Sequence, residues 1–388
     1  MEKDKNPFQR LDIGLLFILS MLAACSIIAI SSSETSLPEY MQNYNFAVKQ
    51  IVWYVVGFIA IGITMIIDFD KFRFIAWYIY GIGMIFLLGL EFNFPASLIQ
   101  ERKGAVAWYE LPGIGTFQPS ELMKVIMIIV LAKIIHEHNE KRIEKSKTDD
   151  LLLLGKIFAA SIPPLLLIAK QPDLGNTMVT CAIIAAMILV SGIRFRYILS
   201  LVGATVFAGC VMVYTYFYHT EFFTTHILKE YQLNRFFGWL APYEYETQGY
   251  QLRTSLLAIG SGELSGKGYQ GGTVYFPEPH TDFIFGVVAE EFGFIGACVV
   301  ISLFFLLLYR MILIGIESND PFGTYLCAGV IGMITFQVFQ NVGMTIGVLP
   351  ITGITLPFMS YGGSALATYM IAIGMVLNVR SRTKNYMF

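Results

Sequence analysis

Long apolar stretches separated by shorter polar segments organise this chain of 388 residues. Ten stretches are long enough, or nearly so, to cross roughly 30 Å of hydrocarbon as helices. The expected spans are 11–30, 47–67, 74–90, 119–135, 152–169, 174–191, 197–217, 283–309, 322–346 and 364–379. The pattern predicts an all-α polytopic membrane protein whose single domain covers residues 1–388, with a large loop at 218–282 between the seventh and eighth spans.

Composition narrows the class of protein further. Hydrophobic residues make up 55% of the chain and charged residues only 14%, which excludes an ordinary soluble globular protein. A formal net charge of -2 gives no reason to expect a nucleic-acid partner. The five cysteines lie inside apolar runs without CxxC spacing, so we interpret them as small buried hydrophobes. No convincing cleavage site follows the first span, which predicts a retained helix.

Basic residues are distributed unequally between alternate loops. One set of short loops and termini contains fifteen: Lys3, Lys5, Arg10, Lys71, Arg73, Lys141, Arg142, Lys145, Lys147, Arg194, Arg196, Arg310, Arg380, Arg382 and Lys384. The opposite set contains eight: Lys49, Arg102, Lys103, Lys170, Lys229, Arg235, Arg253 and Lys267. Because cytoplasmic loops carry the excess of lysine and arginine, both termini are predicted to be cytoplasmic and the 218–282 loop extracytoplasmic.

Charged residues also occur inside the fourth span, which opens with QPSELMK at residues 118–124. Pro119 suits the first helical turn, and Glu121 and Lys124 are three residues apart, so they share a helix face and can pair. A lone charge at the bilayer centre costs roughly 2.5–3.5 kcal/mol on insertion scales, which favours a partner or a wet cavity. An ion pair that serves only folding is the alternative.

Two further polar segments interrupt the apolar pattern at the predicted outer face. In KQPDLGN, residues 170–176, Pro172 breaks one helix and Asp173 is suited to cap the next; a capping carboxylate can also line a cavity. In the loop 103–120, Trp108 is either an interfacial belt residue or a surface on which a sugar stacks.

The segment 347–369 combines two prolines with a Gly-Gly bend. Irregular backbone at membrane depth is tolerated only where protein or a water-filled cavity satisfies it. Ser360, Tyr361, Gly362 and Gly363 stand at the start of the last span, where free N–H groups could bind an anion. A Gly-Gly bend alone is weak support for such a site.

Residues 258–286 contain a glycine-rich stretch followed by TVYFPEPHTDFIFG. The glycine-rich part has Lys267 but lacks the order of a phosphate-binding P-loop, so we interpret it as a flexible outer loop. His280 and Asp282 do not have the spacing of zinc ligands. In isolation, Asp282 is more readily interpreted as the N-cap of the eighth span than as a catalytic group.

Five segments together resemble the SEDS family (shape, elongation, division and sporulation). They are KGAVAWYELPGIGTFQPSELMKV, QPDLG, AIGSG…GKG, FPEPHTDFIFGVVAEEFGFIG and LPITGITLPFMSYGGS, in the family's order and between about residues 100 and 379. The residue pattern of the last segment is most similar to the rod-shape members of this family, and a division or sporulation member is the alternative.

The resemblance implies a ten-helix peptidoglycan glycosyltransferase that polymerises lipid II at the outer face of the bacterial cytoplasmic membrane during cell elongation. It assigns the essential loop carboxylate to Asp282, the loop tryptophan to Trp108, and polar cavity positions to Glu121, Lys124 and Asp173. It also implies a class B penicillin-binding transpeptidase, the elongation machinery and undecaprenyl-pyrophosphate-linked glycan as partners.

The sequence departs from the family's pattern at two positions. Ala107 precedes the tryptophan where relatives often have a larger residue, and Glu263 stands where a second glycine is common. Basic charge near the pyrophosphate is therefore expected to come from outside the segment 103–108.

The implied reaction inverts the anomeric carbon, with Asp282 as general base toward the acceptor hydroxyl. Charge on the leaving group needs stabilisation, for which Lys124 is the first candidate and the Gly362–Gly363 bend the second. A divalent cation, Mg²⁺ or Mn²⁺, would suit a pyrophosphate, although no ligand cluster in the sequence demands one. Glu278 and His280 are expected to shape the rim of the cavity.

Two other functions are compatible with these residues. A lipid II flippase would need a polar route that reaches both faces, whereas the motifs here gather at the predicted outer face, which favours chemistry there. A scaffold that only recruits a partner is the third interpretation.

Overall fold

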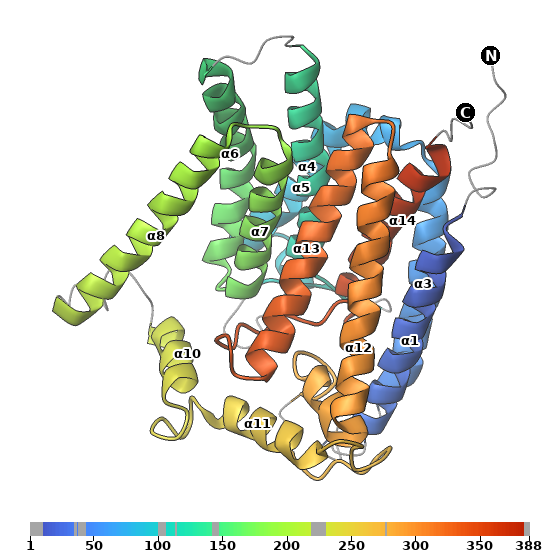
Figure 1. The fold of residues 1–388 in the computed structure, drawn as a ribbon, viewed down its shortest axis with the longest axis vertical. Coiled ribbons are helices and arrows are strands. Elements are labelled where there is room, and N and C mark those ends of the chain that lie inside the picture. The colour runs from blue at the N-terminus through green and yellow to red at the C-terminus, as the bar shows by residue number, and fades with distance from the viewer. Residues whose placement is uncertain are drawn as a thin grey trace.

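The computed structural model describes residues 11–34, 37, 44–99, 106–112, 115–141, 147–218, 230–275 and 278–383. A helix forms at each of the ten predicted spans (Figure 1). They are α1 (Ile13–Ser33), α3 (Phe46–Ile66), α4 (Phe69–Glu91), α5 (Pro119–Glu140), α6 (Lys147–Lys170), α7 (Leu174–Val190), α8 (Phe195–Tyr218), α12 (Ile284–Glu317), α13 (Pro321–Thr345) and α14 (Gly363–Arg382).

Eight of the described helices are long and apolar enough to cross a membrane, and the apolar α7 is shorter, with 17 residues. The remaining predicted span, α5, is the most enclosed of the ten, since it packs against α4, α6, α7, α13 and α14. The all-α, multi-pass class predicted from the pattern is therefore confirmed.

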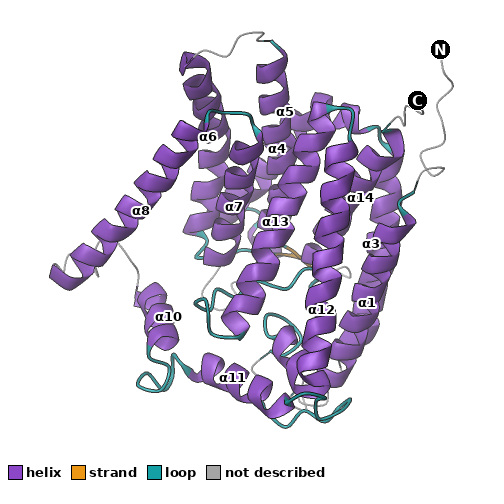
Figure 2. Ribbon diagram, viewed as in Figure 1, coloured by secondary structure: helices purple, strands orange, loops and turns teal. Residues whose placement is uncertain are grey.

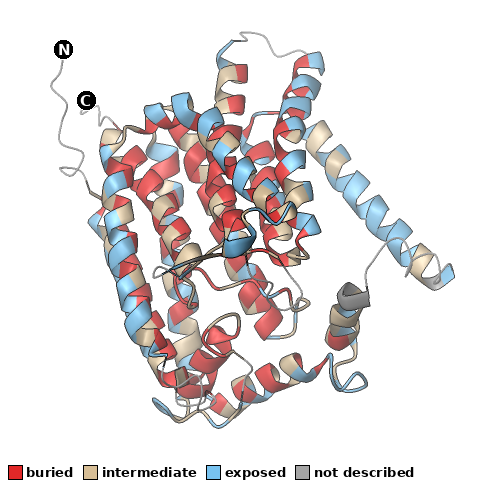
Figure 3. Cartoon of the chain, turned by 180° about the vertical axis from the view of Figure 1, so that it is seen from behind, coloured by how far each residue is buried: buried red, intermediate tan, exposed pale blue. Residues whose placement is uncertain are grey.

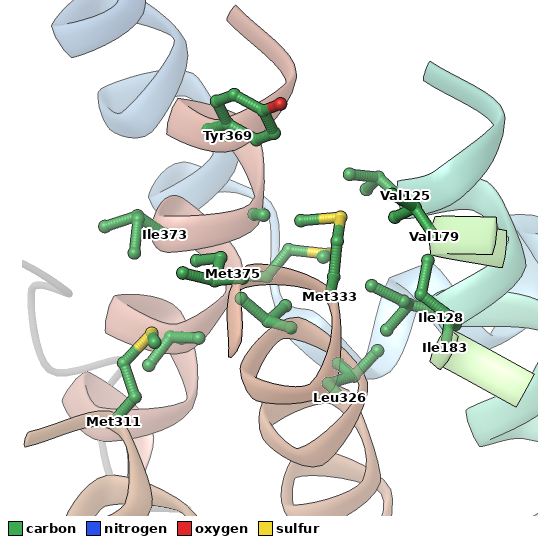
Figure 4. Close-up of a cluster of buried hydrophobic side chains, with 14 of the residues drawn as sticks. Val125, Ile128, Val179, Ile183, Met311, Leu326, Met333, Tyr369, Ile373 and Met375 are labelled. Carbon is green, nitrogen blue, oxygen red and sulfur yellow. The ribbon is translucent and has the colours of Figure 1, made fainter. Parts of the chain in front are cut away.

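One buried cluster runs through the centre of the bundle. Figure 4 shows side chains of α5, α7, α13 and α14 meeting there, among them Val125, Val179, Met333 and Met375. Helix α8 differs from the rest, because it leans away from the bundle and is exposed along its length (Figure 3). The prediction that the cysteines are buried is wrong for most of them: only Cys327 is fully enclosed, and Cys181 and Cys210 face outward.

The start of α1 and the end of α14 lie at the same end of the bundle (Figure 1). Asp12 caps α1 by accepting from Leu15 N at 2.8 Å, and its carboxylate lies 3.0 Å from Arg310 Nε and 4.0 Å from Arg380 Nε. Several of the basic residues counted for the orientation lie outside the described residues: Lys3, Lys5, Arg10, Arg102, Lys103, Arg142, Lys145, Lys229 and Lys384.

The predicted loop 218–282 contains two helices, α10 (Glu230–Leu240) and α11 (Tyr250–Gly262), while residues 219–229 lie outside the described part. Both helices dock on the end of α13. The Trp239 indole donates to Gly347 O at 2.8 Å, and the Ser255 hydroxyl donates to Thr345 O at 2.7 Å. These bonds satisfy carbonyls that a helix end leaves without intrahelical partners.

The glycine-rich stretch is a packed structure, so the prediction of a flexible loop is wrong. Helix α12 is broken at Gly293, where φ is 64° and ψ is -162°. Lys267 N and Gly268 N donate to the carbonyls of Glu290 and Glu291 before the break, at 3.1 and 2.9 Å.

After the break, Phe294 N and Ile295 N donate to the carbonyls of Glu263 and Leu264, at 2.9 and 3.2 Å. The Lys267 ammonium also forms an ion pair with Glu290, with Nζ 2.6 Å from Oε1. The loop therefore supplies the donors and acceptors that a broken helix would otherwise leave unsatisfied in the membrane.

Glu263 ends α11 in a backbone conformation that disfavours its side chain, with φ 49° and ψ -138°. Such a residue costs about 1–3 kcal/mol, and glycine adopts this region without steric penalty. We therefore expect Glu263→Gly to raise the free energy of unfolding by about 1 kcal/mol. Thermal unfolding in detergent would measure it, with Glu263→Ala as the matched control that keeps the strain; equal gains from both variants would contradict this explanation.

The segment 103–120 forms a β-hairpin in its described part rather than the predicted irregular loop (Figure 2). Strand β1 (Tyr109–Leu111) pairs antiparallel with β2 (Gly115–Phe117), and the short 3-10 helix η3 (Ala96–Leu98) precedes them. The Ser364 hydroxyl donates to Thr116 O at 3.0 Å and accepts from Gln118 N at 3.2 Å. These bonds attach the hairpin to the first turn of α14.

Candidate active site

A cavity of about 510 Å³ opens where the hairpin, the α6–α7 turn, α10, the turn before α12 and the segment between α13 and α14 converge. Seven of the predicted site residues line it: Trp108, Glu121, Asp173, Asp282, Tyr361, Gly362 and Gly363. These residues are separated by up to 255 positions in the sequence (Trp108 to Gly363), so tertiary folding alone gathers them. Four carboxylates line the cavity, because Glu278 lines it as well as Glu121, Asp173 and Asp282.

Asp282 lies in the turn that leads into α12. The prediction that it caps this helix is wrong, since the N-cap is Phe283, whose side chain has no polar atom. The Thr281 hydroxyl is 2.6 Å from Asp282 Oδ1, and a Cβ added to Gly353 would lie 3.8 Å from Oδ2. Asp282 therefore lines the cavity and is not the cap of the helix.

The backbone at Asp282 is held from α13. Asn341, which is fully buried, donates from Nδ2 to Asp282 O at 2.8 Å and to Ile354 O at 2.7 Å. One amide thus fastens the turn that carries the carboxylate to the neighbouring segment at Ile354. This double contact fixes the position of Asp282 without using its side chain.

The backbone carbonyls of the irregular segment before α14 accept hydrogen bonds from polar side chains of two helices, α1 and α3. The Ser26 hydroxyl donates to Met359 O at 2.8 Å, Gln50 Nε2 donates to Ser360 O at 3.3 Å, and the Tyr54 hydroxyl donates to Phe358 O. Buried serine, glutamine and tyrosine on otherwise apolar helices are thereby explained, because non-helical backbone at this depth must find partners within the protein.

Ser360 and His280 do not line the cavity; they hold the segments that form its wall. The Ser360 hydroxyl donates to Thr281 O at 2.6 Å and accepts from Leu356 N at 2.8 Å. The His280 ring stacks on Phe46 with centroids 4.2 Å apart, and Tyr361 N donates to the His280 carbonyl at 2.8 Å. The prediction that His280 shapes the rim is wrong, because His280 is buried and does not line the cavity, whereas Glu278 does line it.

Asp173 combines both of the roles that the sequence allowed. It is the N-cap of α7, since Oδ1 accepts from Asn176 N at 2.9 Å. Its Oδ2 accepts from Gln118 Nε2 at 2.9 Å and from Asn176 Nδ2 at 2.8 Å, on the cavity wall. Burial raises the pKa of this carboxyl above its ordinary value, while the hydrogen bonds from Asn176 lower it.

Glu121 and Lys124 form the predicted pair on α5, with Lys124 Nζ 2.7 Å from Glu121 Oε2. Glu121 lines the cavity, whereas Lys124 is fully buried beneath it. The ammonium also lies 5.5 Å from the centre of the Tyr369 ring, whose hydroxyl accepts from Gln337 Nε2 at 2.7 Å. Lys124 therefore does not line the cavity; it lies beneath it as a buried countercharge to Glu121.

The first turn of α14 faces the cavity directly, through Gly362, Gly363 and Ser364. The N-cap is Gly362, so the first backbone N–H groups of this helix receive no capping side chain. Gly363 has no room for a larger residue, because an added Cβ would meet the Trp53 ring at 2.2 Å. The close approach of Trp53 explains the second glycine of the bend.

Several lining residues were not predicted from the sequence. Arg235 from α10 is the one cation that lines the cavity among the described residues, and it had been counted only for the topology. Thr281 and Gln118 touch predicted carboxylates, and Asn341 acts from beneath. Within the described ranges, no group of three or more His, Cys, Asp or Glu residues is arranged to hold a metal ion.

The described chain is a multi-pass helical bundle with a cavity at one end. Carboxylates line this cavity, and the irregular segment beside it finds hydrogen-bond partners within the protein. These features define the class: a membrane protein with a polar site at one end. The family model of the cell cycle proteins FtsW, RodA and SpoVE matches residues 12–385. The chain belongs to this family, which is the SEDS family that the sequence resembles, and it is a multi-pass protein of the cytoplasmic membrane.

Individual relatives match over nearly their whole length. Stage V sporulation protein E of Bacillus subtilis (strain 168) is 35% identical over 386 residues, covering 97% of this chain and 98% of that protein. A probable peptidoglycan glycosyltransferase FtsW of Geobacter sp. (strain M18) is 32% identical over 387 residues, covering 96% of this chain and 97% of that protein.

Solved structures have the same fold. The crystal structure of the rod shape determining protein RodA of Thermus thermophilus matches with a TM-score of 0.68 and 25% identity, covering 98% of this chain and all of that one. A chain of a peptidoglycan synthase complex that coordinates polymerization and crosslinking matches with a TM-score of 0.75 and 27% identity, covering 96% of this chain and 98% of that one.

Proposed function

We propose that this protein is a peptidoglycan glycosyltransferase that polymerises lipid II in the 510 Å³ cavity. The observation that carries the proposal is Asp282, a carboxylate that lines this cavity from a turn fixed by Asn341. Relatives named peptidoglycan glycosyltransferase FtsW support the same reaction.

In the proposed reaction, Asp282 accepts the proton of the acceptor 4-hydroxyl as that oxygen attacks the anomeric carbon of the donor. A positioned base contributes typically about 10²–10⁴-fold to such a proton transfer. Undecaprenyl pyrophosphate leaves from the opposite side, so the anomeric configuration inverts in one displacement. Trp108 offers a ring on which a sugar can stack, and Asp173 and Glu121 are hydrogen-bond acceptors for hydroxyl groups.

We propose that the cavity opens to the outer face and that both termini are cytoplasmic. The excess of basic residues in one set of loops supports this orientation. Asp12, just before α1, lies close to Arg310 and to Arg380, which is near the end of α14. The start of the first helix and the end of the last helix are therefore at the same end of the bundle. The undecaprenyl tails would then lie against the apolar helices while the sugars occupy the cavity.

Leaving-group charge would be stabilised at the cavity surface rather than by Lys124, which is buried behind Glu121. The uncapped first turn of α14 presents backbone N–H groups toward the cavity, and helix N-termini favour anions. A Mg²⁺ or Mn²⁺ ion would accompany the pyrophosphate as substrate counterion. Lys124 instead pairs with Glu121 beneath the cavity.

A class B penicillin-binding transpeptidase is the proposed partner, because a chain of similar fold belongs to a peptidoglycan synthase complex that coordinates polymerization and crosslinking. We further propose a role in cell elongation, with division and sporulation as the alternatives that the relatives include. Depletion that rounds rod-shaped cells would support elongation, and filamentation would support division.

Transport of lipid II is the competing function, and it needs a polar route through the bundle. At the end opposite the cavity, buried His138, Asp149 and Asp150 surround a space of only about 10 Å³. A space of that size holds about one water molecule, far too little for a disaccharide headgroup. The small size of this space favours catalysis over transport.

The decisive experiment reconstitutes the purified protein with its transpeptidase partner in vesicles that contain lipid II. We expect glycan strands on a gel, formed from lipid II in the leaflet that faces the cavity. Movement of fluorescent lipid II between leaflets without any glycan product would instead establish the transporter. Absence of both would leave only recruitment of the partner, and the proposal would be wrong.

A further inference from the structure

The cavity has an imbalance of charge that the proposed reaction must resolve. Glu121, Asp173, Glu278 and Asp282 all line it, and Lys124, which pairs with Glu121, lies beneath the cavity surface. A pyrophosphate brought into this space would meet mostly carboxylates. A cation at the surface of the cavity is therefore required, and Arg235 is the one that the described residues supply.

The guanidinium of Arg235 is largely uncommitted. Its one recorded contact within the described part of the chain is a long hydrogen bond of 3.4 Å from Nη1 to Ile351 O. No carboxylate of the described residues forms an ion pair with it, although four carboxylates line the same cavity. An arginine has five N–H donors in a planar fork, so most of them remain available to a ligand.

The helix that carries Arg235 is held firmly against the cavity wall. Trp239, one turn further along α10, donates to Gly347 O at 2.8 Å. Gly238 approaches the chain at Gln248 so closely that an added Cβ would lie 2.4 Å from the Gln248 carbonyl oxygen. These contacts place Arg235 on a preorganised surface, which reduces the conformational entropy lost when it binds an anion.

We propose that Arg235 binds the diphosphate group of the lipid-linked donor and of the departing undecaprenyl pyrophosphate. A guanidinium matches two phosphate oxygens in a bidentate arrangement, which a buried lysine behind a carboxylate cannot do. This assignment rests on the proposed function, because it identifies the part of the proposed lipid-linked substrate that α10 binds. It also supplies the basic charge that was expected to come from outside the segment 103–108.

Binding of undecaprenyl pyrophosphate and of undecaprenyl phosphate to the purified protein in detergent tests the assignment without catalysis. We expect Arg235→Gln to weaken binding of the pyrophosphate about tenfold or more, because charge-assisted bonds are lost. Arg235→Lys should retain part of the affinity. Arg253→Gln is the matched control: Arg253 donates to Glu246 O at 2.8 Å and lies outside the cavity lining, so its affinity should stay within about twofold of wild type.

The preference for pyrophosphate over monophosphate separates recognition from folding. If Arg235→Gln melts at the wild-type temperature and keeps both the affinity and the preference, the assignment is overturned. If Arg235→Gln melts early, loss of the preference in Arg235→Lys supports the assignment, and a retained preference overturns it. Glycan synthesis measured in parallel distinguishes the two proposals. A wild-type protein that makes no glycan but binds pyrophosphate through Arg235 refutes only the polymerase.

Discussion

Purified Asp282→Asn is expected to make glycan from lipid II at least about 10²-fold more slowly than the wild type, and up to about 10⁴-fold. The substitution keeps the size and the hydrogen-bonding capacity of the side chain but removes the basic oxygen. The fold should survive, because the turn is held through the Asp282 carbonyl by Asn341, and the Asp282 side chain does not cap the helix. The rate of polymer formation on gels and the melting temperature are the two measurements.

Glu278→Gln is the control for the charge of the cavity, since Glu278 is a second carboxylate in the same lining. It removes one negative charge without touching the proposed base. We expect its rate to stay within about tenfold of wild type, because it adds no proton-transfer defect. A wild-type rate for Asp282→Asn, or equal losses in both variants, would show that Asp282 is not the base.

Gly262→Ala is expected to destabilise the protein strongly. An added Cβ at Gly262 would lie 2.0 Å from the carbonyl oxygen of Ala289, in the first half of α12. Backbone cannot move as a flexible side chain does, so α11 would separate from α12 at a cost of about 1–3 kcal/mol or more. Because that half of α12 follows Asp282 directly, glycan synthesis should fall together with the melting temperature.

The matched control lies two residues earlier on the same helix. At Gly260 no heavy atom of the described residues outside its immediate neighbourhood lies within 4 Å of an added Cβ. Gly260→Ala should therefore be neutral or stabilising by up to about 1 kcal/mol, as expected for glycine in a helix. Thermal unfolding in detergent compares the two variants, and equal melting temperatures would refute the close contact between α11 and α12.

Features governed by local pattern could be predicted from the sequence. Helices lie at every long apolar run, Glu121 and Lys124 pair across one turn, and Asp173 caps α7. Each depends on residues within four positions of one another, where hydrophobic period, spacing and capping preference determine the outcome. The family resemblance then identified Asp282 despite its ordinary local context.

Features that depend on distant backbone could not be predicted. Gly293 is one glycine in an apolar run, and its break is stable only because residues 263–268 supply donors and acceptors from another part of the chain. Arg235 lies far in sequence from the carboxylates, and it lines the same cavity because Trp239 docks α10 on the end of α13. The cap at Phe283 rather than Asp282 reflects the bonds of Asn341 and Ser360 to this turn.

The central claim is that lipid II reacts in the cavity between the hairpin, α10 and the segment before α14. Photo-crosslinking tests this claim most directly. The purified, inactive Asp282→Asn protein is exposed to a lipid II analogue that carries a photoreactive group on its sugar, and the modified peptides are identified by mass spectrometry. We predict modified peptides that contain Trp108, Thr281 or Ile351, all of which line the cavity. Modification confined to the opposite end, around Asp149 and Asp150, would contradict the claim.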